Sequence, residues 1–299
     1  MAQLGEGRLT PPDWVRCMHD PSAKLQGLWA HKLKDSNRES LLRELSGDDR
    51  VDFRSCGGPG AGGFLEAPVA RDGEVAAVMP DSHFTVSLRD CLRLPLCAPG
   101  SICQRRDANG VLCGEALDPR GKHCKLCEFG PARTGRHDSL RDFVARYHRS
   151  STGLVTTKEQ RVVAWDRVNP RTGQLEEARL DVATRDAATG LPVFVDATVT
   201  CAYSGYAPCQ RARANKDGVA AASAVSSKRA RYPPSGGDLV PFAFEDGGRP
   251  AEETVAFVRS WGYGFPLGER SEVIRFAWQQ LSAHLQLGNA EMILSSKGG

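Results

Sequence analysis

Three cysteines and a histidine lie in a short segment, at a spacing that suits a metal ion. Cys103, Cys113, His123 and Cys127 are separated by nine, nine and three residues. Zinc takes four nitrogen and sulfur ligands in a tetrahedral arrangement, so this spacing predicts a zinc knuckle at residues 99–131. A module of about 30 residues cannot bury enough apolar surface to fold alone, and metal binding would supply most of its folding free energy.

Neighbouring cysteines leave the ligand set open. Cys124 adjoins His123, only one of Cys124 and Cys127 needs to bind, and Cys97 could replace Cys103. The alternative to a metal site is a set of free thiols beside a surface histidine. A disulfide framework is disfavoured, because the chain begins without an apolar run of signal-peptide length and most of its 10 cysteines crowd into one segment.

Two aspartates could hold a second kind of metal. Asp181 and Asp196 fall on the two strands of a predicted hairpin, and Glu159 on the preceding predicted strand is a third candidate ligand. Converging carboxylates bind divalent cations such as Mg²⁺, which act as Lewis acids and as a source of hydroxide for phosphodiester hydrolysis. The alternative is that these carboxylates are solvated surface groups.

Basic side chains near such a metal could help the reaction or hold DNA. Lys228 and Lys216, on a predicted alanine-rich helix, are candidates for orienting the attacking water and offsetting the charge of the phosphorane. Arg229 and Arg231 extend the basic run after Lys228. That run could contact phosphate, form a solvated helix end favoured by the helix dipole, or act as a nuclear localisation signal; the first two are favoured.

A second basic pair lies just after the predicted knuckle. Arg136 and His137 precede a predicted helix that Asp138 or Ser139 would cap. Backbone amides at a helix N-terminus can hold a phosphate, so this pair is a candidate DNA contact. A structural contact between the knuckle and the following domain is the alternative.

The elements that must position these residues follow the order α-β-β-β-α-β-α. Hydrophobic periodicity and turn residues predict helices at 138–147, 211–232 and 251–261 and strands at 153–163, 177–184, 191–201 and 239–244. Along the third strand, Asp196 falls on the more polar face because successive side chains alternate. Further helices are predicted at 82–96 and at 272–287, the latter for packing, and a glycine-rich hinge at 56–63.

Composition bounds the class of protein. The chain of 299 residues is 40% hydrophobic and 25% charged, which is typical of a globular protein with one mid-sized core and an added module. The net charge is only +3, but basic residues cluster at 99–150 and 207–235, which indicates an anionic partner reached by patches. No apolar run could span a membrane, so we expect an intracellular protein, nuclear in a eukaryote.

Four stretches together resemble the zinc knuckle and restriction-like endonuclease domain of site-specific non-LTR retrotransposons and their stand-alone relatives, a domain of the PD-(D/E)XK nuclease superfamily. The likeness covers roughly residues 56–262. It rests on Val111–Cys127 (VLCGEALDPRGKHCKLC), Arg136–Asp142 (RHDSLRD), Arg179–Asp181 followed by Val195–Val199 (RLD…VDATV), and Ser227–Tyr232 (SKRARY).

The resemblance implies a mixed sheet flanked by helices, Mg²⁺-dependent DNA cleavage and a knuckle that helps to place the duplex. By motif position, Asp181 is the first catalytic aspartate, Asp196 the second acidic residue and Lys228 the lysine displaced onto the next helix, with Glu159 at an acidic position of the preceding strand. The chain departs from the family at Leu180, where proline is usual, at Asp138, where asparagine is usual, and in the wide spacing of its first cysteine pair.

The resulting hypothesis is a metal-dependent DNA endonuclease in five segments: a polar N-terminal segment (1–55), a helical linker (56–98), the knuckle (99–131), the nuclease-like core (132–265) and a C-terminal helix and tail (266–299). Two other classes compete with it. One is a zinc-containing nucleic-acid-binding protein whose nuclease site has decayed, and the other is a zinc-stabilised protein-interaction module without a DNA partner.

Overall fold

The computed structural model describes residues 25–45, 47–68, 77–187, 189–203, 207–234 and 238–298. The chain divides into two compact units, Met1–Arg50 and Val51–Gly299. Helix α2 (Leu25–Glu44) belongs to the first unit, and α3 (Gly47–Ser55) crosses the boundary. All of the residues singled out above for chemistry belong to the second unit.

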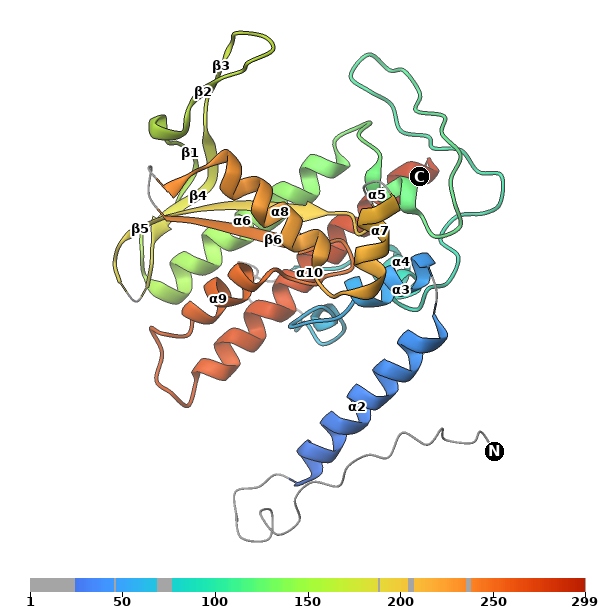
Figure 1. Cartoon of the computed structure of the whole chain (residues 1–299), viewed down its shortest axis with the longest axis horizontal. Helices are drawn as coiled ribbons and strands as arrows, with labels where there is room; N and C mark the ends of the chain where they lie inside the picture. Colours follow the sequence, from blue (N-terminus) through green and yellow to red (C-terminus); the bar gives the residue numbers. More distant parts are fainter. Residues whose placement is uncertain are drawn as a thin grey trace. The chain divides into compact units, whose positions relative to one another are not determined.

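A four-stranded mixed sheet lies at the centre of the second unit, in the order β1-β4-β5-β6 (Figure 1). Its strands are β1 (Thr157–Arg161), β4 (Arg179–Arg185), β5 (Pro192–Thr200) and β6 (Asp238–Glu245). The pairs β1–β4 and β4–β5 are antiparallel, whereas β5 and β6 are parallel. A parallel pair requires a crossover connection, and helices α7 (Ala207–Asn215) and α8 (Val219–Arg231) form it here.

Helices cover both faces of this sheet. On one face, α6 (Ala132–Thr152), α9 (Glu252–Ser260) and α10 (Arg270–Lys297) enclose the main core with inward residues of β4, β5 and β6. On the other face, Ala221 and Val225 of α8 pack against Ala243 of β6. Because side chains alternate along a strand, Ala243 points away from Phe242 and Phe244, which belong to the main core.

Shorter elements surround the sheet. They are a two-stranded hairpin of β2 (Arg167–Val168) and β3 (Leu175–Glu176), the 3-10 turns η1 (Gly63–Leu65) and η2 (Val163–Trp165), and the helices α4 (Asp81–Cys91) and α5 (Lys122–Leu126). In Figure 1 the β2–β3 hairpin and the loops before α5 project at the same end of the unit.

The sequence predicted the mixed α/β class and a sheet flanked by helices, and both are confirmed. The four core strands lie within a few residues of their predicted bounds. The β2–β3 hairpin was not predicted, since its two-residue strands carry no periodic signal. The predicted single helix at 211–232 is two helices, because Gly218 adopts φ 71° between them.

The start of helix α6 was predicted wrongly. It begins at Ala132, after Pro131 with φ −84°, and not at Asp138 or Ser139. Proline is favoured at helix starts because its ring fixes φ in the helical range. Arg136 and His137 therefore lie inside the helix, and the proposed phosphate contact with free amides at a helix N-terminus does not apply to them.

The predicted glycine hinge is a docked segment. A Cβ atom on Gly60 would lie 2.7 Å from the Trp278 ring, and one on Gly63 would lie 2.9 Å from the Cα of Gln279. Only glycine permits this approach, so the segment rests directly on α10. The sequence composition indicated flexibility, but the glycines serve close packing instead.

Another glycine fixes the position of the helix that carries His137. A Cβ atom on Gly288 of α10 would lie 3.0 Å or less from three carbon atoms of Arg136 on α6. We expect Gly288→Ala to force the two helices apart and to destabilise the protein by about 1–3 kcal/mol. Gly135→Ala is the matched control on α6, because its Cβ would meet nothing within 4 Å. Urea unfolding of both variants checks this, and equal stabilities would contradict it.

Among the described helices, none combines the length and apolar character needed to cross a membrane.

Candidate functional site

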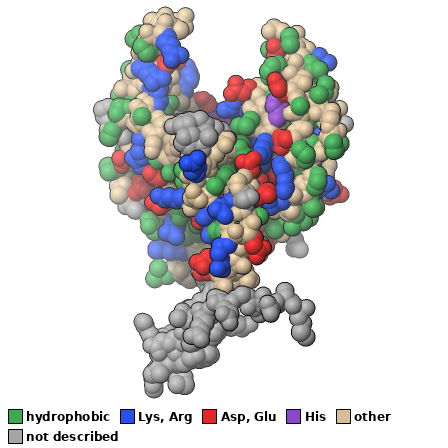
Figure 2. Space-filling view, turned by 45° about the vertical axis from the view of Figure 1, so that its right-hand side comes forward, with side chains coloured by type: hydrophobic (Ala, Val, Ile, Leu, Met, Phe, Trp, Pro, Cys, Tyr) green, Lys and Arg blue, Asp and Glu red, His purple; other side chains and the backbone are tan. Residues whose placement is uncertain are grey.

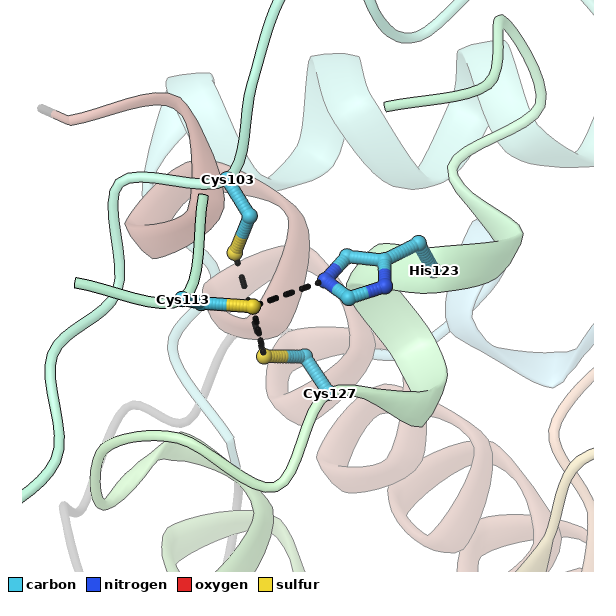
Figure 3. Close-up of side chains that lie close together, drawn as sticks. All are labelled: Cys103, Cys113, His123 and Cys127. Atoms are coloured by element: carbon cyan, nitrogen blue, oxygen red, sulfur yellow. Dashed lines mark hydrogen bonds between the residues drawn. The ribbon is translucent and has the colours of Figure 1, made fainter. Parts of the chain in front are cut away.

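Cys103, Cys113, His123 and Cys127 converge on one point (Figure 3). Their ligand atoms all lie within 4.8 Å of one another. The Sγ atoms of Cys103 and Cys127 are 3.8 Å apart, those of Cys127 and Cys113 are 3.7 Å apart, and Cys113 Sγ lies 3.4 Å from His123 Nε2. A tetrahedral zinc ion separates two sulfurs by about 3.8 Å and a sulfur from a nitrogen by about 3.5 Å. The cluster could therefore hold a metal ion such as zinc.

Local hydrogen bonds bring these four ligands together. The chain folds back after Cys103, whose amide donates to Glu115 O while Cys113 N donates to Arg105 O. Asp118 then accepts hydrogen bonds from the amides of Arg120 and His123, which sets the start of the short helix α5. His123 lies in that helix and Cys127 directly follows it. The fold-back therefore presents Cys103 and Cys113, and the short helix presents His123 and Cys127.

The two alternative ligands form a separate pair. Cys97 and Cys124 are buried with their Sγ atoms 3.8 Å apart, and neither belongs to the metal-ligand group among the described residues. Burial raises the pKa of Cys124 to about 12 and that of Cys127 to about 11, so the pKa does not distinguish these two thiols. The pKa of Cys103 is lowered although burial opposes this, because the Arg105 backbone amide and neighbouring side chains donate to its sulfur. The geometry therefore favours Cys103 and Cys127 over Cys97 and Cys124.

Residues 99–131, the predicted knuckle, are joined to the rest of the second unit by buried contacts. Arg105 donates to Cys127 O and to Met292 O on α10. The ammonium of Lys125 on α5 is buried, 3.1 Å from Asp90 and 3.3 Å from Asp246. Removal of one partner from such a buried ion pair is strongly destabilising, because it leaves an unpaired charge in the interior. These contacts fix the knuckle against the carboxyl end of β6.

Asp181 and Asp196 lie next to each other in the sheet. Both are buried, with exposed fractions of 6% and 5%. The β4–β5 ladder pairs Val182 with Val195, so continuing its register places Asp181 opposite Asp196. Instead of a backbone pair at this point, Asp181 Oδ2 accepts a hydrogen bond of 2.6 Å from Ala197 N. The Asp181 carboxylate thus occupies the place where the two strands separate.

Two basic side chains contact this aspartate pair from different helices. Lys228 Nζ, from the last turn of α8, lies 2.8 Å from Asp196 Oδ2. His137 Nε2, from α6, lies 3.0 Å from Asp181 Oδ2. The sequence named His137 only as a candidate DNA contact, and its contact with Asp181 was missed because it depends on the early start of α6. Asp138 contacts the other ring nitrogen of His137 at 3.3 Å.

The surroundings of the Asp196 carboxyl group disfavour its charged form. Burial raises its pKa from 3.8 to about 6; the Lys228 ammonium opposes this rise, and the neighbouring Asp181 adds to it. Asp196 Oδ2 is fully buried, and its partner is the Lys228 ammonium, 2.8 Å away. Two adjacent buried carboxylates offer the oxygen ligands that a hard cation prefers.

This pKa gives a testable pH dependence. A carboxyl group with a higher pKa in the folded state binds more protons there, so stability falls as pH rises from its ordinary value of 3.8 to about 6. We expect Asp196→Asn to be more stable than the wild type at pH 8, by up to about 3 kcal/mol, and to lose most of this advantage at pH 4. Urea unfolding in buffer without Mg²⁺ measures it. An advantage independent of pH would contradict it.

The other predicted site residues lie apart from this trio of Asp181, Asp196 and Lys228. Glu159, on β1 with φ 55°, falls opposite Asp181 in the register, but its half-exposed carboxylate pairs with Arg141 at 2.6 Å. Lys216 is exposed in the turn after α7. Arg229 is exposed and lies 3.4 Å from Glu253. Arg231 donates to Trp165 O at 2.7 Å, so it anchors the end of α8.

Arg136 is buried rather than exposed. Only 4% of its surface is accessible, and its Nη1 donates to Asn289 Oδ1 of α10 at 2.8 Å. Burial lowers its pKa to about 10, which leaves the guanidinium charged at neutral pH. The residue nevertheless lines two adjoining pockets.

These pockets form a basic groove beside the aspartates. One of about 290 Å³ is lined by His137, Lys228 and Ala197, which contact the aspartates, and by Arg133, Thr134, Arg136, Thr198 and Val199. The second, of about 400 Å³, shares Lys228, Arg133 and Arg136 and reaches Lys125 and Leu126 of the knuckle; it also contains one carboxylate, Glu128, which pairs with Arg133. The groove therefore leads from the aspartate pair to the segment that carries the Cys/His cluster. Arg133 was not singled out in the sequence, because it belongs to no recognisable motif; Thr198 lies in the VDATV stretch, but no role was assigned to it.

Comparison of the chain with protein-family models, with curated proteins and with solved structures finds no match.

Proposed function

We propose that this chain is a metal-dependent endonuclease that hydrolyses phosphodiester bonds of DNA, with a restriction-endonuclease-like core and a structural zinc knuckle. The observation that carries the proposal is the meeting of Asp181, Asp196 and Lys228, from two adjacent strands and the following helix, at the wall of a basic groove. The observed order of elements, with its parallel β5–β6 pair, supports the same core.

Asp181 and Asp196 would hold a Mg²⁺ ion together with water. When bound, such an ion stabilises the charge that develops on the phosphate and makes hydroxide available at neutral pH. The chain keeps the two carboxylates in place by its own contacts: the Ala197 amide and His137 orient Asp181, and Lys228 holds Asp196. This preorganisation limits the rearrangement that substrate binding would need.

Lys228 would act as a cation at the scissile phosphate. Its ammonium donates hydrogen bonds and accepts none, so while it is charged it cannot serve as the base. Its side chain is 29% exposed and lines the groove, so it can reach a phosphate oxygen while remaining close to Asp196. In this position it would orient the attacking water and offset the negative charge of the phosphorane.

The groove would bind the DNA backbone. Arg133, Arg136 and Lys228 supply positive charge, and the Thr134 and Thr198 hydroxyl groups can donate to phosphate oxygens. Figure 2 shows two projecting parts of the molecule with a hollow between them and basic side chains near it. In Figure 1 the β2–β3 hairpin and the knuckle loops project at this end. Such a hollow offers space for a nucleic-acid strand beside the groove.

Nicking of supercoiled plasmid by the purified, zinc-loaded protein tests this function. We expect open-circular product with Mg²⁺ or Mn²⁺ and none when divalent cations other than the bound zinc are left out. If the protein binds DNA with strong salt dependence but nicks none, the proposal fails and a zinc-containing binding protein with a decayed site replaces it. If it binds no DNA above background, a protein-interaction module becomes the better account.

A further inference from the structure

A separate pocket, of about 850 Å³, lies between the glycine segment (residues 56–63) and helices α9 and α10. It shares no lining residue with the basic groove. Its volume is within the range of roughly 300–1,000 Å³ that is usual for ligand sites. Nothing in the proposed nuclease reaction uses it, so it needs an explanation of its own.

The charge of this pocket favours an anion. Arg259 of α9 and Arg270 and Arg275 of α10 line it, against one carboxylate, Glu66. Arg259 is exposed and forms none of the ion pairs among the described residues, while Arg275 lies 3.7 Å from an exposed Glu272, a weak contact. At least two guanidinium groups are therefore available to a phosphate, which they can bind with paired hydrogen bonds.

Aromatic side chains supply the second half of the site. Tyr263 is 52% exposed, and the Arg270 guanidinium lies 5.7 Å from its ring centre. Arg270 is itself held by donation to Phe265 O at 2.9 Å. Trp278 lines the pocket on α10, where Gly60 packs against it. The exposed Tyr263 ring next to these arginines forms a surface on which a planar base can stack, and the half-buried Trp278 adds to the pocket wall.

We propose that this pocket binds an unpaired nucleotide, with its phosphate on Arg259 and Arg275 and its base stacked on Tyr263. A base within a duplex is stacked on its neighbours and cannot enter such a pocket, so the occupant is a single-stranded segment of nucleic acid or a free nucleotide. The glycine wall contributes no bulky side chain: a Cβ on Gly62 would meet nothing within 4 Å. An open backbone wall leaves room for the sugar and phosphate.

The test measures binding of a fluorescent oligodeoxythymidine to full-length protein carrying Asp196→Asn, so that cleavage cannot interfere. We expect Arg259→Gln with Arg275→Gln to weaken binding at least tenfold and to reduce the slope of log K against log salt by about 1.4, the value for two lost phosphate contacts. We expect Tyr263→Leu to weaken it at least fivefold, from the loss of one stacked base. Lys34→Gln with Arg146→Gln removes the same charge from exposed positions elsewhere and is expected to change little.

Two further arms define the source of the ligand and the place of contact. Thymidine monophosphate competing at equal nucleotide concentration indicates a free-nucleotide site, whereas competition by the oligonucleotide alone indicates a strand site. Photocrosslinking of a bromodeoxyuridine oligonucleotide is expected to label the peptide that contains Tyr263. Unchanged affinity and slope in the arginine variant, or competition by an acidic peptide but by no nucleotide, would overturn the proposal. Nicking by the wild type is scored separately, so failure of one site does not imply failure of the other.

Discussion

The purified protein is expected to contain one zinc ion per chain, and Cys113→Ser is expected to lose it. The reason is the closeness of the four ligand atoms, which all lie within 4.8 Å of one another; three of their separations, 3.4–3.8 Å, match a tetrahedral zinc site. Zinc loading would release protons, because burial raises the pKa of the Cys127 thiol to about 11 in the metal-free site. Elemental analysis of the protein after dialysis gives the stoichiometry.

Loss of zinc is also expected to lower stability strongly. The knuckle packs Cys103, Leu117 and Cys124 against Ala290 and Ile293 of α10, so its melting would expose the end of that helix. We expect the thermal midpoint to fall by about 10 °C, which corresponds to several kcal/mol in a chain of this size.

The buried pair Cys97 and Cys124 provides the control for the ligand assignment. Cys124→Ala removes a buried thiol of the same segment but none of the four converging ligands. We expect this variant to keep one zinc ion per chain, even though the small cavity lowers its stability. Loss of zinc from Cys124→Ala together with retention by Cys113→Ser would show that the ligand set has been assigned wrongly.

Replacement of Lys228 by methionine is expected to lower the rate of plasmid nicking at least about 100-fold. Removal of one preorganised donor to a developing negative charge typically has an effect of this size. The change also leaves Asp196 buried beside Asp181 without its cation, so its pKa rises further and the pair holds a metal less well at neutral pH. The two effects act in the same direction.

Arg229 provides a matched control one residue along the same helix. It is exposed and lies 3.4 Å from Glu253, and it does not line the groove. We expect Arg229→Gln to nick within about threefold of the wild type. Lys228→Arg, which keeps a cation, is expected to retain more activity than Lys228→Met. Wild-type nicking by Lys228→Met would exclude a role of this side chain in the reaction.

Local sequence signals were sufficient for much of this structure. The spacing of Cys103, Cys113, His123 and Cys127 predicted a ligand group that the fold brings together. The alternation along residues 191–201 placed Asp196 on the face opposite the main core, and α8 covers that face. Both signals are local in the chain, so they did not depend on knowing the tertiary contacts.

Contacts between distant segments could not be predicted in the same way. The pairing of His137 with Asp181 depends on where α6 begins and on where β4 and β5 separate. The burial of Arg136 depends on the approach of Gly288, which lies far along the chain. Likewise, the glycine-rich composition of 56–63 is compatible with a hinge or with close packing, and only the position of Trp278 decides between them.

The most direct test of the proposed nuclease site compares the nicking rates of three zinc-loaded proteins in Mg²⁺: the wild type, Asp196→Asn and Asp238→Asn. Asp238 is an exposed carboxylate at the start of β6 and provides the matched control for charge and chemistry. We expect Asp196→Asn to nick at least about 1,000-fold more slowly than the wild type and Asp238→Asn to match it. Equal rates in the wild type and Asp196→Asn would contradict a nuclease site at this aspartate pair.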